Sequence, residues 1–112
     1  MNSCNFVGRL SKDPNLTFTS TGKAVCNFTI AINKNYTNAD GSRDADFLNC
    51  VIWGKRAEAL ANYNRKGSRV GVNARAQSRF YEAEGGKKVY VTEFYCDEVE
   101  FLENKENNQT AQ

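Results

Sequence analysis

Hydrophobic and polar residues alternate along most of this chain, and a period of two is typical of β-strands with one buried face. Residues 68–81 are the clearest example, with polar odd positions and an apolar even row predicted to face the core: Val70, Val72, Ala74, Ala76 and Phe80. Other segments rich in Val, Ile, Phe and Thr also favour strands, and turn-forming residues separate them. The predicted strands are 4–10, 16–19, 23–35, 45–53, 68–82 and 88–102.

The hydrophobic period changes in the segment 55–66, which predicts the single helix. Its alanines and leucine favour a helix, and Ala57, Leu60 and Ala61 lie near one face. Lys66 and Gly67 predict its end, because a cation suits the last turn and glycine suits the left-handed residue that follows. A glycine-containing turn at 84–86 joins the last two strands into a hairpin.

The order of these elements predicts an all-β fold. About five strands, with one short helix before the final hairpin, indicate a small closed five-stranded barrel of the OB type, with an open α+β sandwich as the structural alternative. The length of 112 residues suggests one domain, residues 1–102. Residues 103–112 contain no apolar residue larger than alanine, which predicts a short disordered tail.

The composition is that of an ordinary soluble globular protein, with 40% hydrophobic and 25% charged residues. No stretch approaches 18 consecutive apolar residues, and residues 1–10 lack the basic and then apolar layout of a signal peptide. We therefore expect a cytoplasmic protein without membrane contacts.

The four cysteines are spaced too widely for a close-paired zinc site; they are Cys4, Cys26, Cys50 and Cys96. Each lies in an apolar run, where a free cysteine acts as a small buried hydrophobic residue. A zinc site with four cysteine ligands is the alternative, but we expect no bound metal and no cofactor.

The formal net charge of +2 is too small to indicate nucleic-acid binding by itself. Residues 55–79, however, contain seven basic side chains and one acidic side chain. The odd face of strand 68–82 carries Arg69, Arg75, Arg79 and Tyr81, and no acid. Arginine binds phosphate in a bidentate manner and stacks on bases, so we interpret this row as a ligand face rather than an ordinary solvated face.

Four aromatic side chains are predicted to point outward near cations: Tyr36, Phe47, Trp53 and Tyr81. Aromatic platforms along a positive groove are what sequence-tolerant binding of single strands requires. The predicted phosphate contacts are Arg9, Lys34, Lys55, Arg56, Arg69, Arg75 and Arg79. Alternation alone also permits Phe47, Val51 or Trp53 to fill a subunit interface.

Nothing in the sequence indicates an enzyme. There is no histidine to act as a base, no phosphate-binding loop and no nucleophile elbow. The acidic residues Asp40, Asp44 and Asp46 flank a glycine-containing turn, where they suit loop capping better than catalysis.

Several short segments occur in a specific order and spacing over about residues 5–102. They are Val7-Gly8-Arg9-Leu10 with Asp13-Pro14, residues 22–31, 47–58 and 63–68, Arg79-Phe80-Tyr81, and residues 89–93. In these segments the chain resembles the bacterial and phage single-stranded DNA-binding proteins, the SSB family.

The resemblance implies an OB fold, usually assembled as a homotetramer (or dimer), that binds and protects single-stranded DNA without catalysis. Such proteins serve DNA replication, recombination, repair or DNA uptake. The resemblance also implies stacking roles at Tyr36, Phe47, Trp53 and Tyr81, although many relatives carry Trp where this chain has Tyr or Phe.

The chain departs from the family pattern at its end, which lacks a long linker and an acidic tip that ends in Phe. We therefore expect no recruitment of enzymes through the tail, as in short SSB paralogues or a phage-borne version. The alternative functions are an RNA-binding OB-fold protein and an OB-type protein-interaction module.

Overall fold

The computed structural model describes residues 1–102, so the tail predicted for residues 103–112 lies outside the described part. Each strand lies within two residues of its predicted bounds. The elements are β1 (Cys4–Leu10), β2 (Asn15–Phe18), β3 (Ala24–Asn33), β4 (Ala45–Trp53), α1 (Lys55–Tyr63), β5 (Arg69–Glu82) and β6 (Lys88–Phe101). A single 3₁₀ turn, Glu84–Gly86, joins β5 to β6.

The strands close into a barrel. The order in the sheet is β1-β5-β6-β4-β3-β2, and β1 also pairs with β3, so that β1, β5, β6, β4 and β3 form a ring of five. Strand β2 pairs with β3 beside this ring. The β4–β6 contact is parallel and short, joining Cys50 to Phe94 and Val51 to Tyr95. The predicted OB-type barrel is confirmed, and the open sandwich is wrong.

The core lies inside the ring and is built from the inward rows that alternation predicts. The buried side chains are Leu10, Ala24, Cys26, Phe28, Ile30, Cys50, Ile52, Val70, Val72, Ala74 and Cys96, with Ala57 and Leu60 from α1. Helix α1 contacts β3 most extensively and also touches β2, β4 and β6. Burying each large aliphatic side chain stabilises the fold by about 1.5–3 kcal/mol, so the inward rows stabilise the closed barrel.

Helix α1 ends three residues before the predicted position. Asn64 is already extended, with φ −129°, and its backbone N–H and side-chain amide both donate to the carbonyl of Leu60. Gly67 adopts the expected positive φ of 92°, but in the turn after the helix. Its N–H donates to the carbonyl of Leu10 at 2.8 Å, which ties this turn to the end of β1.

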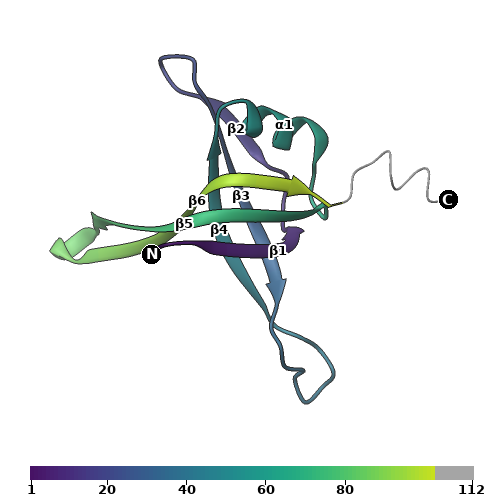
Figure 1. Ribbon diagram of the computed structural model, residues 1–112. Helices are drawn as coiled ribbons and strands as arrows, with labels where there is room; N and C mark the ends of the chain where they lie inside the picture. The colour runs from purple at the N-terminus through teal and green to yellow at the C-terminus, as the bar shows by residue number, and fades with distance from the viewer. Residues whose placement is uncertain (103–112) are drawn as a thin grey trace.

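Three segments project from the ring: the β5–β6 hairpin, the β3–β4 loop and the β2–β3 turn (Figure 1). Because β5 continues beyond the ring, its inward row has no core to face after Ala76. The prediction that Phe80 lines the interior is therefore wrong: it is 53% exposed. Phe80 instead packs on Tyr90 across the hairpin, with ring centroids 5.8 Å apart, and Lys88 lies 4.9 Å from its ring.

The cysteines are free thiols with the burial expected of hydrophobic residues. Cys26, Cys50 and Cys96 are buried and Cys4 is half-buried. Burial raises the pKa of the Cys26 thiol to about 11. A hydrogen bond with Cys96, together with burial, raises the pKa of Cys50. Within residues 1–102, no three His, Cys, Asp or Glu side chains gather where a metal could bind.

Across the same part of the chain, no helix is long and apolar enough to cross a membrane.

Candidate nucleic-acid interface

The outer face of β4 carries an aromatic side chain at each end. Phe47 is 63% exposed and Trp53 is 41% exposed, as alternation predicted. Trp53 follows Phe47 by six positions, which is about 20 Å along a strand. The register with β3 places Ala31 opposite Phe47 and Val25 opposite Trp53, so neither ring faces another aromatic side chain on that strand.

Between the two aromatics lies a groove of about 370 Å³. One wall is the outer face of β3 and β4, and the other is the β5–β6 hairpin. The polar lining residues are Lys12, Asp13, Asn15, Asn27, Thr29, Asn49, Arg79 and Glu93, with Val51 among the apolar ones. Val51 belongs to the outward row but is only 7% exposed, because β6 pairs with β4 at this point. Val51 is therefore not available to fill a subunit interface.

A second hollow, of about 360 Å³, lies beside Trp53 and gathers three cations: Lys23, Arg56 and Arg75. The ammonium of Lys23 lies 5.3 Å from the centroid of the Trp53 ring. Sequence reasoning missed Lys23, although it immediately precedes β3 and lies two residues before the partner of Trp53. The hollow combines a stacking surface with positive charge.

Three of the predicted phosphate contacts form ion pairs with acids from neighbouring strands. Lys34 binds Asp46 at 2.8 Å, Arg75 binds Asp97 at 3.3 Å and Arg79 binds Glu93 at 2.7 Å. The odd-numbered row of β5 contains no acid of its own, but β6 supplies Asp97 and Glu93 beside it. The interpretation of this row as a ligand face stays a prediction. The three cations are themselves at least one-third exposed, and exposed ion pairs contribute little free energy, so a phosphate can still compete for them. Glu93 is the most covered of the three acids, with 17% of its side chain exposed.

The same pairs shift the pKa of two cations. A hydrogen bond and the charge of Asp46 raise the pKa of Lys34, and Glu93 does the same for Arg79. Both cations therefore stay charged over the whole range in which nucleic acid is studied. Each ion pair therefore lowers the net positive charge around its cation, while the cation itself stays charged.

The remaining predicted cations lie at two places on the surface. Arg69 is opposite Arg9, and Arg9 is also opposite Ala31, so the row continues across the barrel to Phe47. Arg9 donates to the carbonyl of Gly67 at 2.9 Å. Two like charges in direct cross-strand register repel each other, and a bound anion relieves that repulsion.

Lys55 and Arg56 occupy the first turn of α1, next to Trp53. The positive end of the helix dipole lies there, so an anion is electrostatically favoured at this point.

Tyr36 and Tyr81 lie on segments that project from the ring. Tyr36 is 55% exposed in the β3–β4 loop, and Tyr81 is 50% exposed on the β5–β6 hairpin. All four aromatics predicted to point outward are therefore exposed. Strand β4 presents Phe47 and Trp53 on one face, whereas the two tyrosines lie on two segments that project from the ring (Figure 1).

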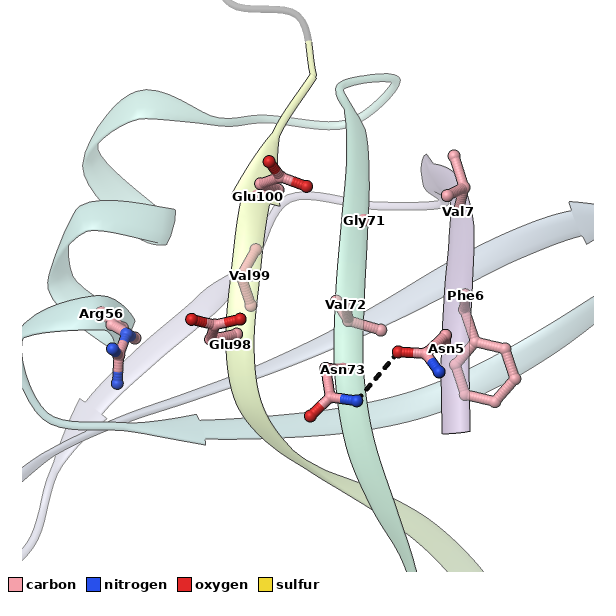
Figure 2. Close-up of a pocket in the computed structure, with 10 residues that line it drawn as sticks. All are labelled: Asn5, Phe6, Val7, Arg56, Gly71, Val72, Asn73, Glu98, Val99 and Glu100. Atoms are coloured by element: carbon pink, nitrogen blue, oxygen red, sulfur yellow. Dashed lines mark hydrogen bonds between the residues drawn. The ribbon is translucent and has the colours of Figure 1, made fainter. Parts of the chain in front are cut away.

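Figure 2 shows a different hollow, of about 490 Å³, on the outer face of β1, β5 and β6. Glu98 and Glu100 stand on β6, and the amide of Asn73 donates to Asn5 at 2.8 Å. In this view Arg56, at the start of α1, lies on the side of Glu98 that faces away from β5 and β1. This hollow has two carboxylates and one cation, Arg56, whereas the groove beside β3 and β4 balances Asp13 and Glu93 with Lys12 and Arg79. The candidate interface is therefore the β3–β4 face, which also carries the two exposed aromatics.

The fold and this surface define a class of protein. A small closed barrel with exposed aromatic side chains beside cations is the arrangement by which OB-fold proteins hold oligonucleotides. The chain belongs to the Single-strand binding protein family, whose sequence pattern matches residues 1–102. The resemblance seen in the short motifs is thereby confirmed.

Curated relatives agree with this family. The chain is 53% identical over 108 residues to Single-stranded DNA-binding protein 2 of Listeria monocytogenes, covering 96% of this chain and 68% of that protein. It is 52% identical to the Single-stranded DNA-binding protein of Enterococcus faecalis, covering 94% and 56%, and 54% identical to that of Bacillus cereus, covering 92% and 61%. The chain thus spans about 56–68% of the length of these three relatives.

Proposed function

We propose that this protein binds and protects single-stranded DNA, without catalysis, in DNA replication, recombination, repair or DNA uptake. The observation that carries the proposal is the outer face of β4, where Phe47 and Trp53 stand exposed on either side of a groove. Membership of the family and the printed names of the relatives support the same substrate.

The mechanism is stacking combined with phosphate contacts. A base stacked on an aromatic side chain contributes about 1–3 kcal/mol, and every base has a face that can stack. The assigned stacking residues are Tyr36, Phe47, Trp53 and Tyr81, and the assigned phosphate contacts are Arg9, Lys34, Lys55, Arg56, Arg69, Arg75 and Arg79. Binding is therefore tolerant of sequence and weakens with salt, by about 0.7 in log–log slope for each phosphate contacted.

Titration with oligo(dT), oligo(U) and duplex DNA at two salt concentrations tests the proposal. Tight, salt-sensitive binding of oligo(dT), with weaker binding of duplex, supports it. A preference for oligo(U) favours the RNA-binding alternative. Binding to none of the three leaves the protein-interaction module as the function.

Residues 1–102 form the DNA-binding domain in this proposal, and the protein acts in the cytoplasm as a homotetramer (or dimer) without recruiting enzymes through residues 103–112. The closed ring and its continuous core support the domain assignment. Native mass spectrometry with and without oligo(dT) measures the assembly, and a monomer under both conditions contradicts it. Repeating the oligo(dT) titration with residues 1–102 alone tests whether the domain suffices.

A further inference from the structure

The hollow of about 360 Å³ beside Trp53 carries an excess of positive charge. The described residues that line it include three cations, Lys23, Arg56 and Arg75, and one acid, Asp97, so the net charge of the lining is +2. The groove of about 370 Å³ along β4 is lined by two cations and two acids, so its net charge is zero. An anion such as a backbone phosphate is therefore attracted to the hollow more strongly than to the groove.

A tight connection between β3, β4 and α1 places two of these cations. Lys23 immediately precedes β3, and the carbonyl of the next residue, Ala24, accepts a hydrogen bond from the N–H of Gly54 at 2.9 Å. Gly54 has a positive φ of 80°, which glycine adopts readily, so the chain turns from Trp53 directly into α1. This turn brings Arg56, in the first turn of the helix, to the same hollow as Lys23.

Strands β5 and β6 supply the other two charged side chains of the hollow. The register between these strands shifts here and leaves Asp97 without a partner on β5, as in a β-bulge. Asp97 pairs with Arg75 at 3.3 Å, so this cation is already engaged. Within residues 1–102, neither Lys23 nor Arg56 forms an ion pair. Arg56 also borders the hollow of Figure 2, which contains two carboxylates, so Lys23 is the cation best placed to bind an anion beside Trp53.

The ammonium group of Lys23 lies over the ring of Trp53, 5.3 Å from the ring centroid. In the described part of the chain this ammonium makes no hydrogen bond. A cation–π contact at an exposed site is weaker than a charge-assisted hydrogen bond to a phosphate. A base that stacks on Trp53 therefore displaces the ammonium from the ring, and the flexible lysine side chain moves it onto the phosphate of the same nucleotide.

We propose that the hollow beside Trp53 is a phosphate-binding subsite and that Lys23 is a DNA-binding residue. Lys23 and Arg56 bind the phosphate of the nucleotide whose base stacks on Trp53, while Arg75 remains paired with Asp97. Lys23 is absent from the phosphate contacts that the sequence predicted. The inference deepens the proposed function and rests on it, because the subsite is filled only when a base lies on Trp53.

Titration with oligo(dT) over a series of salt concentrations tests the subsite. The loss of one phosphate contact predicts that Lys23→Gln lowers the log–log salt slope by about 0.7 and weakens binding about tenfold at low salt. Lys23→Arg keeps the charge and should restore both values. Lys66→Gln is the matched control, because Lys66 is an exposed lysine outside the linings of the hollow and the groove, and it should change neither.

The results separate a phosphate contact from two other roles of Lys23. If Lys23→Gln weakens binding but leaves the slope unchanged, Lys23 only supports the Trp53 ring and the inference is wrong. If Lys66→Gln lowers the slope equally, the effect is one of net charge and the inference is again wrong.

The same substitution in a Trp53→Ala background tests whether the phosphate belongs to the stacked nucleotide. Two groups that bind one nucleotide are coupled, so Lys23→Gln should lower the slope by less than half as much in this background. An equal fall in both backgrounds contradicts the inference while the proposed function stands. If the wild type does not bind oligo(dT), the proposed function is wrong as well.

Discussion

Trp53 is the side chain whose removal tests the interface most directly. It is 41% exposed, so a base can stack on the open part of the ring while roughly three fifths stays against the protein. Loss of one stacked base costs about 1–3 kcal/mol, which corresponds to roughly 5- to 150-fold in Kd. We therefore expect Trp53→Ala to bind oligo(dT) 5- to 150-fold more weakly than the wild type.

The same replacement also lowers the stability of the fold. A tryptophan side chain has about 200 Å² of surface, so its covered part is about 120 Å². At about 25 cal/mol per Å², Trp53→Ala lowers the free energy of unfolding by up to about 3 kcal/mol. Urea unfolding of each variant shows whether the protein is folded under the conditions of the titration.

Trp53→Phe is the matched variant, because it keeps a stacking ring and most of the packing. We expect it to retain most of the affinity that Trp53→Ala loses. Trp53 is the only tryptophan, so its fluorescence also reports binding in the wild type, and oligo(dT) should quench it. Unchanged emission at saturation, together with unchanged Kd in a folded Trp53→Ala variant, refutes the assignment of Trp53 to the interface.

Three further predictions follow from ion pairing, the hairpin and the buried thiols. Glu93→Gln frees Arg79 from its ion pair, so the salt dependence of oligo(dT) binding should steepen by about 0.7 in log–log slope, and an unchanged slope contradicts a phosphate contact there. Phe80→Ala should lower the free energy of unfolding in urea by no more than about 1 kcal/mol, because Phe80 packs in an exposed cross-strand pair; a core-like loss of 2–5 kcal/mol would mean that it is buried. Burial raises the pKa of Cys26 from 9.0 to about 11, so its contribution to stability is complete below pH 9 and is lost as the pH rises towards 11. Urea unfolding at pH 8 and pH 10 should show a smaller loss in Cys26→Ala than in the wild type, and equal losses would exclude this thiol as the cause.

The strands and the outward position of the aromatics could be predicted from the sequence because both depend on local alternation. Strand 45–53 shows this well: its period of two identifies Cys50 and Ile52 as core and Phe47 and Trp53 as exposed, as the structure shows. The bounds of β1 and β4 are the predicted ones for the same reason. Alternation describes the two faces of one strand, and this needs no knowledge of its neighbours.

Only the tertiary structure decided which side chains face each other. Asp97 and Glu93 neutralise part of the arginine row because β6 lies beside β5, and Lys23 reaches Trp53 because β3 pairs with β4. Phe80 lies outside the core because the hairpin extends past the closed ring. Register and ring closure depend on contacts between residues far apart in the sequence. The charge around each aromatic, and the groove between Phe47 and Trp53, therefore could not be predicted from single strands.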